Sequence, residues 1–401
     1  MIDFYTSPSF YLLLVATVIP AAILGFSGHR IRRYGLVASL LFIALLFSGR
    51  LSELLALLFF LGIASGTTLI VLREWRQTGP GGGRRRLWVY RLSLAAVAAP
   101  LVCGKLGGLF DENILGFIGI SYLTFKALQV LIEIRDGLIE RLNPLDYLYF
   151  LLFFAPFTSG PIDRSRRFIQ DANRRFARAE YAGLLAKGIT LLLLGAVYKL
   201  VFSAVASLNY TPETLASGFG PLEVAEAIKD AWAYGLYLFF DFAGYSLMAI
   251  GAGCCFGIVT PPNFRAPFAA CDIKDFWNRW HMTLSFWLRD FVFMRFTRFA
   301  LKHQLLGSRQ TVACTGYLLN MTLMGVWHGL TFDYLTYGLF HGFLLAATDV
   351  YQKRSRFYRR YKDTRPYQIA SWALTLNLVM FGFALFSGQA QLILGGLLDG
   401  D

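Results

Sequence analysis

The chain has 401 residues, of which 56% are hydrophobic and only 16% are charged. Soluble domains carry about 25% charged residues, so this composition excludes an ordinary soluble protein and indicates one that is dissolved mainly in lipid. The net charge of +13 would suit nucleic acid, but the placement of the charges favours a membrane surface instead.

Apolar stretches recur from Phe10 to Leu392 with no long soluble segment between them. Crossing a bilayer takes about 20 apolar residues per helix. We therefore predict one all-α, polytopic membrane domain over residues 1–401. The predicted crossings, about ten in all, are residues 9–27, 34–48, 54–72, 87–104, 114–134, 183–205, 231–258, 311–327, 334–349 and 367–387.

Basic residues orient these crossings. Six clusters hold 31 of the 38 lysines and arginines, whereas the connections at residues 109–113 and 209–226 are acidic or poor in basic residues. Because cytoplasmic loops are enriched in Lys and Arg, we expect the clusters to face the cytoplasm of a plasma-membrane protein and anionic headgroups, not nucleic acid. Both termini are then extracellular. The clusters span residues 30–33, 73–86, 135–141, 164–178, 265–309 and 353–365.

Residues 145–157 are apolar but too short to cross, and basic clusters lie on both sides of them. We predict a re-entrant hairpin that enters from the cytoplasm and breaks at Pro156 and at Gly160 with Pro161. Broken backbone at membrane depth is tolerated only where protein or a water-filled cavity surrounds it. We therefore expect a cavity near this hairpin, and a local pair of Asp163 with Arg164 just after it.

The stretch from Pro261 to Arg309 mixes aromatic and basic residues, and we predict amphipathic helices at the cytoplasmic face. On a helix, Asn278 and His281 would share one face at a spacing of three. One interpretation is an interfacial helix with snorkelling arginines and an aromatic belt. Asn278 and His281 are short polar groups that cannot snorkel, so they favour the alternative, a polar channel.

His328 lies at the end of an apolar segment, just before Gly329. An intramembrane histidine is either packed and hydrogen-bonded in the core or functional. As a general base, a neutral imidazole would take the proton from an acceptor hydroxyl that attacks an ester or thioester carbonyl. His341 is expected to be a core contact, and His29 and His303 are expected to be solvated.

Charged residues inside apolar segments require partners. Asp241 is one of them, and Arg279 or Arg164 would serve as its partner; orienting a catalytic histidine is the alternative role. For Lys126 and Glu133 we expect ion pairs between helices. Five cysteines without CxxC spacing suggest neither disulfides nor a metal site. No Walker A, GxGxxG or HExxH motif is present, so the acyl donor must arrive already activated.

Four segments occur in a characteristic order: FFDFAGYS (239–246), PPNFRAPF (261–268), FWNRWHMTLSFWLRD (276–290) and MGVWHG (324–329). Together they resemble the membrane-bound O-acyltransferase (MBOAT) family, over a motif-bearing core of residues 118–342. Within it, GISYLTFKALQVLIEIRDG, FTSGPIDR and RDFVFMR are similar to the D-alanyl transferase (DltB) branch. The polysaccharide O-acetyltransferase branch typically continues after WLRD with a YIPLGG-like stretch, which this chain lacks.

The resemblance implies a ring of about ten or eleven transmembrane helices around tilted and re-entrant central helices, with an extracellular funnel and a cytoplasmic tunnel opening. It makes His328 the catalytic histidine and His281 its supporting histidine. The other candidates that we place along the substrate tunnel are Asn278, Arg279, Trp327, Asp241, Ser159, Asp163 and Arg164. The residues that we expect to dock a carrier protein are Phe291, Val292, Met294 and Arg295.

The implied donor is D-alanine held as a thioester on the phosphopantetheine of a small acidic (DltC-like) carrier protein, with no cofactor bound by the chain itself. A basic cytoplasmic face suits an acidic carrier, because complementary charge speeds encounter. The acceptor is teichoic acid or a relay hydroxyl on a partner, and DltD-like and small DltX-like membrane proteins are further implied partners. The alternatives are O-acetyl transfer to a polysaccharide and a transporter or flippase that uses the broken hairpin as a substrate path.

Overall fold

The computed structural model describes residues 4–78, 83–110, 115–211 and 221–389, and the described part is helical without β-strands. Six of its helices are long and apolar enough to cross a membrane. This confirms the predicted all-α polytopic membrane protein. The six spans are Pro8–Phe26, Leu51–Gln77, Arg84–Gly107, Arg178–Ser207, Val224–Cys255 and Arg365–Gln389.

The remaining four predicted crossings coincide with helices that are shorter or more polar than these six, so their passage through the membrane stays a prediction. The helices at these four positions are α2, α5, α14 and α15. The sidedness of the termini, the ring and its funnel stay predictions as well. Much of the acidic connections at 109–113 and 209–226 lies outside the described residues.

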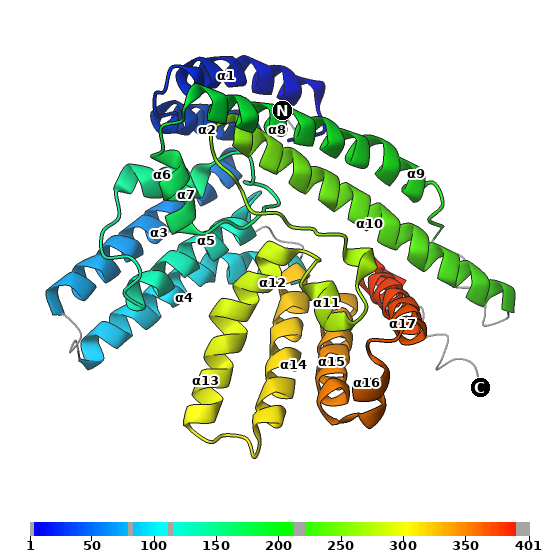
Figure 1. Cartoon of the computed structure of the whole chain (residues 1–401). Coiled ribbons are helices and arrows are strands. Elements are labelled where there is room, and N and C mark those ends of the chain that lie inside the picture. Colours follow the sequence, from blue (N-terminus) through cyan, green and yellow to red (C-terminus); the bar gives the residue numbers. More distant parts are fainter. Residues whose placement is uncertain (1–3, 79–82, 111–114, 212–220, 390–401) are drawn as a thin grey trace. The chain divides into compact units, whose positions relative to one another are not determined.

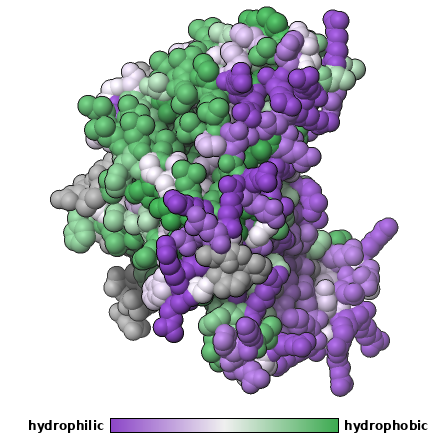
Figure 2. All heavy atoms as spheres, turned by 90° about the vertical axis from the view of Figure 1, so that its left-hand side faces the viewer, coloured by the Kyte–Doolittle hydropathy of each residue, from purple (hydrophilic) through white to green (hydrophobic). Residues whose placement is uncertain are grey.

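In the view of Figure 2, hydrophobic side chains gather over one broad area and hydrophilic side chains over another, as expected for a protein in a membrane.

The chain divides into two compact units, one made of Met1–Ala196 with Tyr245–Pro262 and the other of Val197–Gly244 with Asn263–Asp401. Two long helical stretches continue from one unit into the other.

The first unit is built mainly from eight consecutive helices (Figure 1). Helices α3, α4 and α5 pack on one another, and α6 packs on α2, α5 and α7. The bounds are α1 Pro8–Phe26, α2 Arg32–Leu46, α3 Leu51–Thr78, α4 Arg84–Gly107, α5 Ile120–Arg135, α6 Pro144–Leu152, α7 Ser165–Ala172 and α8 Arg178–Val197.

The predicted break of the re-entrant segment is confirmed, because α6 ends at Leu152 and the chain continues without regular helix to Arg164. Lys126 of α5 donates hydrogen bonds to the carbonyl oxygens of Phe150 (3.0 Å) and Leu151 (3.4 Å), at the end of α6. The last carbonyls of a helix have no partner within the helix, so a buried ammonium group stabilises this break. The predicted ion pair of Lys126 was therefore wrong.

For Glu133 the expected ion pair between helices is confirmed, since its carboxylate in α5 forms a salt bridge with Arg166 of α7. Its carboxylate accepts a hydrogen bond of 2.9 Å from the Ser165 hydroxyl, and the Arg166 guanidinium lies farther away, at 3.9 Å. The hydroxyl therefore satisfies the buried carboxylate more closely than the cation does.

In the second unit, α14 and α15 form an antiparallel hairpin (Figure 1). Their backbones approach closely at Gly325 and Gly338, where a side chain would collide with main-chain atoms of the facing helix. Three stretches widen into π-helical turns, Tyr198–Phe202, Arg289–Phe293 and Leu385–Gln389. The helices are α9 Ser203–Ser207, α10 Pro221–Cys255 (up to Gly244), α11 Ile273–Trp277, α12 Met282–Leu288, α13 Met294–Lys302, α14 Arg309–His328, α15 Phe332–Arg354, α16 Arg356–Tyr361 and α17 Arg365–Ala384.

The prediction of one helix through Asn278 and His281 was wrong, because α11 ends at Trp277 and α12 begins at Met282. The main chain of this break pairs with the preceding PPNF segment: Arg265 N–H donates to the Arg279 carbonyl and Met282 N–H donates to the Asn263 carbonyl. These long-range bonds replace the helical bonds that a continuous helix would make. Asn278 and His281 therefore do not share a helix face.

Candidate active site

His328 is the last residue of α14, half-buried and surrounded by aromatic rings. Its ring centroid lies 4.5 Å from Trp327, 6.0 Å from Tyr334 and 4.8 Å from Phe386. Tyr334 belongs to α15, and Phe386 belongs to the π-helical turn after α17. The ends of three helices therefore hold this imidazole in place.

His281 is 4% exposed and has a left-handed backbone with φ of 42° at the start of α12. The motif residue Asn263 holds this turn, since its carbonyl accepts from Met282 N–H at 2.8 Å and its side chain accepts from the Thr283 hydroxyl at 2.5 Å. The His281 ring packs against Phe242, with centroids 4.7 Å apart. In the described part of the chain, its Nε2 atom has no hydrogen-bond partner.

The two histidines line the same small cavity, with a volume of about 40 Å³. The Trp327 ring lies near both, with its centroid 6.3 Å from His281 and 4.5 Å from His328. Burial, reinforced by the nearby His328, holds the pKa of His281 well below its usual value. Burial thus favours a neutral imidazole at His281, whose Nε2 has no partner in the described residues. The other lining residues are Leu238, Phe242, Trp277, Trp280, Met324, Tyr337, Phe383 and Phe386.

A second cavity, of about 250 Å³, shares Trp277 and Met324 with the first, and more polar side chains line it. It is lined by Asn278 and by Asn320, whose buried Oδ1 has no hydrogen-bond partner in the described residues. Its lining also includes Arg289. A wider polar cavity thus adjoins the small aromatic one, separated from it by two side chains.

The predicted docking residues lie beside this second cavity. Phe291 and Val292 belong to the π-helical turn Arg289–Phe293, and Met294 and Arg295 begin α13. The two ends of that turn, Arg289 and Phe293, line the cavity. Met294 is exposed, whereas the other three side chains are half-buried. This geometry brings the predicted docking segment to the cavity; its role stays a prediction.

The charged candidates of the second unit have partners other than those expected. Asp241 forms its salt bridge with Lys199 of the π-helical turn before α9, so the predicted pairing with Arg279 was wrong. Arg279 instead pairs with Asp275 at 2.7 Å, one helical turn earlier. No group of three His, Cys, Asp or Glu side chains in the described residues is arranged to hold a metal ion.

The remaining candidates, Ser159, Asp163 and Arg164, belong to the first unit, and their place along a tunnel stays a prediction. Ser159 N–H donates to the Tyr245 hydroxyl at 3.1 Å. Asp163 accepts from the backbone N–H of Arg164 at 2.6 Å, but its salt bridge is with Arg167. Asp163 and Arg164 therefore pair locally through a backbone hydrogen bond, whereas the ion pair of Asp163 is with Arg167.

Sequence reasoning missed several residues that surround the histidines. Tyr337 and Phe386 line the small cavity, and Lys199 neutralises Asp241. The spacing Tyr334, Tyr337, His341 was a usable signal, since residues three and four apart share one helix face. Of the other histidines, His341 is fully buried as expected, and His29 and His303 are exposed as expected.

Comparison with known proteins adds two findings. A sequence model of the membrane-bound O-acyltransferase family matches residues 108–388. Two relatives named teichoic acid D-alanyltransferase are each 37% identical: one from Bacillus subtilis (strain 168) covers 96% of this chain and 98% of its own length, and one from Lacticaseibacillus rhamnosus covers 96% of both. A probable alginate O-acetylase of Pseudomonas aeruginosa is 30% identical over 68% of this chain and 49% of its own length.

Proposed function

The chain belongs to the membrane-bound O-acyltransferase family, and from this premise we propose that it transfers D-alanine from a carrier-protein thioester in the cytoplasm to a hydroxyl group outside the membrane. Acyl transfer is the chemistry of the family. The choice of D-alanine is supported by the two relatives named teichoic acid D-alanyltransferase, which match 96% of the chain. The acceptor hydroxyl belongs to teichoic acid or to a relay protein.

The observation that carries this proposal is the pair of histidines on one small aromatic cavity, with a wider cavity lined by more polar side chains beside it. A long, flexible donor arm with amide groups suits the polar cavity, where Asn278 and Asn320 offer hydrogen bonds. A reacting carbonyl then lies at the narrow end, near His281 and His328. The aromatic walls exclude water, which protects a thioester from hydrolysis.

The transfer itself requires one base and one proton path. His328 takes the proton from the acceptor hydroxyl, whose oxygen attacks the thioester carbonyl carbon. The C–S bond breaks, and His328 returns the proton to the departing sulfur, so that an ester and a free thiol result. The unpartnered Nε2 of neutral His281 is placed to hydrogen-bond the donor in the same cavity.

The decisive experiment compares His328→Ala with His303→Ala. His303 is an exposed histidine directly after α13, whereas the turn that lines the second cavity lies before α13. Membranes that contain each variant receive carrier protein loaded with labelled D-alanine, and label transferred to membrane acceptors is counted. We expect His328→Ala to lose at least about 100-fold, the usual contribution of a general base, and His303→Ala to retain full transfer.

Unchanged transfer by a folded His328→Ala variant would contradict the proposal. Transfer of labelled acetyl groups in place of D-alanine would instead support the O-acetyl alternative, which the alginate O-acetylase relatives keep open. Movement of an intact substrate without any bond change would support a transporter.

Carrier docking is tested separately at Met294, which is 37% exposed beside the polar cavity. Met294→Asp places a negative charge opposite an acidic carrier, so we expect KM for the loaded carrier to rise about tenfold with kcat little changed. The matched control is Phe299→Asp, an exposed position farther along the same helix. Equal effects of both variants would show that the docking surface lies elsewhere.

A further inference from the structure

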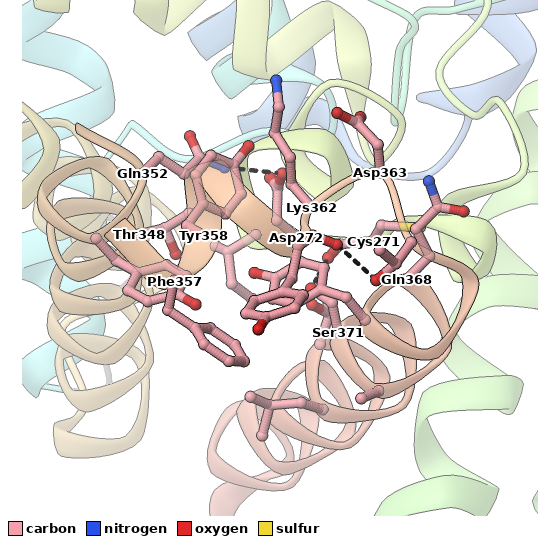
Figure 3. Close-up of a pocket in the computed structure, with 18 of the residues that line it drawn as sticks. Cys271, Asp272, Thr348, Gln352, Phe357, Tyr358, Lys362, Asp363, Gln368 and Ser371 are labelled. Carbon is pink, nitrogen blue, oxygen red and sulfur yellow. Dashed lines mark hydrogen bonds between the residues drawn. The ribbon is translucent and has the colours of Figure 1, made fainter. Parts of the chain in front are cut away.

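A third cavity of the second unit lies between α15, α16 and α17 and has a volume of about 790 Å³. It shares no lining residue with either cavity of the candidate active site. Small-molecule sites commonly measure about 300–1,000 Å³, so this one is large enough for a ligand. In Figure 3, Lys362 and Asp363 lie toward one end, and Phe357 and Ser371 lie toward the other.

The lining changes from polar to apolar along the two antiparallel helices. At one end lie Lys362 and Gln368, close to the start of α17, where the membrane span Arg365–Gln389 begins. Further along the span the lining is formed by Leu344 of α15 and by Leu374 and Leu378 of α17. The cavity therefore extends from the start of an apolar span along its first turns.

Positive charge gathers at the polar end. Residues 353–365 carry seven Lys and Arg and one acidic residue, Asp363. In the part of the chain that the structure describes, Arg356, Arg359 and Lys362 are exposed and form no salt bridge. The other lining carboxylate, Asp272, already accepts hydrogen bonds from Gln352 and from the backbone of α11.

Aromatic side chains form the rim. Phe357 and Tyr358 of α16 both contact Tyr367 of α17, with ring centroids 6.1 Å apart in each pair, and Tyr358 also contacts Tyr351 of α15 at 5.6 Å. Aromatic rings of this kind settle at the level of lipid headgroups. Basic pockets between membrane helices bind anionic headgroups.

We propose that this cavity binds one anionic glycerophospholipid, with its phosphate at Lys362 and an acyl chain along Leu344, Leu374 and Leu378. Two helices connect this cavity with the active site. Helix α15 contributes Tyr337 to the His328 cavity, and α17 contributes Phe383 with Phe386 just beyond it. A lipid held between α15 and α17 therefore sets the spacing of the side chains that enclose His328.

The test uses the full-length protein in detergent, with native mass spectrometry to count bound phosphatidylglycerol and phosphatidylcholine. We expect the wild type to prefer phosphatidylglycerol about fivefold, and Lys362→Glu to abolish that preference, because a basic group near a headgroup contributes about a factor of five. The matched control is Arg359→Glu, the same charge reversal outside the cavity lining, which should keep the preference within about twofold.

A second variant tests the apolar end independently of charge. Ala347 lines the cavity, so Ala347→Phe should narrow it and reduce retention of both lipids, with the protein still monodisperse. Retention of both lipids equally by the wild type, or equal losses in Lys362→Glu and Arg359→Glu, would overturn the proposal in favour of non-specific lipid.

Two further outcomes would reassign the site rather than support it. Displacement of the lipid by glycerol phosphate alone would identify a site for a soluble phosphate compound. Displacement by an acidic carrier protein that no longer binds Lys362→Glu would identify a protein-docking surface.

Discussion

Two sets of buried polar groups, one set in each unit, differ in whether they have hydrogen-bond partners. In the first unit, Lys126 donates to two carbonyl groups and Asp163 is bound by Arg167 and by a backbone N–H. In the second unit, within the residues described, His281 Nε2 and Asn320 Oδ1 are buried without a partner. Buried polar groups are normally hydrogen-bonded. The first set therefore stabilises the fold, and the second set is placed to meet a ligand.

The largest effect that this comparison predicts is for His281→Ala. We expect acyl transfer to fall about 100-fold, the usual contribution of one donor that faces the reacting group. The stability should change little from hydrogen bonding, because Nε2 loses no partner. Single-turnover transfer from loaded carrier is the measurement, and thermal unfolding in detergent checks the fold. Normal transfer by a folded His281→Ala variant would show that the unpartnered nitrogen has no role in transfer.

Lys126→Met should show the opposite pattern. It leaves two buried carbonyl groups at the end of α6 without their donor, which costs about 1–3 kcal/mol per unsatisfied group. We expect a lower denaturation midpoint and less folded protein, with transfer per folded molecule unchanged. The matched control is Lys302→Met, an exposed lysine at the end of α13. A loss of transfer without a loss of stability would contradict the purely structural role of Lys126.

Prediction from sequence succeeded where the signal was local. Hydropathy located the helices, and the short apolar run before Pro156 indicated the break after α6. Prediction from sequence failed where the partner of a residue lies far along the chain. Asp241 pairs with Lys199, 42 residues away, and hydropathy shows only that such a carboxylate needs a partner.

The candidate site shows the same limit. The motifs identified His281 and His328, but a helical pattern through residues 276–295 concealed the break that Asn263 imposes by hydrogen bonds across about 20 residues. Phe386 follows an apolar span and carries no signal of its own; only tertiary packing brings it to His328. Chemistry-bearing residue types can be recognised in a sequence, whereas the apolar walls that enclose them depend on packing between helices.

The smallest effect on transfer and stability is expected for a replacement of His341. This replacement tests most sharply whether an unpartnered buried nitrogen indicates function. Both of its ring nitrogens are buried without a partner among the described residues, yet it lines neither active-site cavity. Replacing such a group by an apolar one loses no hydrogen bond and is often nearly neutral. We therefore expect His341→Leu to change the free energy of unfolding by less than about 1 kcal/mol and to retain transfer. Tyr337→Leu, one turn away on the cavity wall, is the matched control and should reduce transfer more. If His341→Leu instead abolished transfer as His281→Ala does, an unpartnered nitrogen would mark function even outside a cavity, and the position of the cavities would no longer separate catalytic from structural histidines.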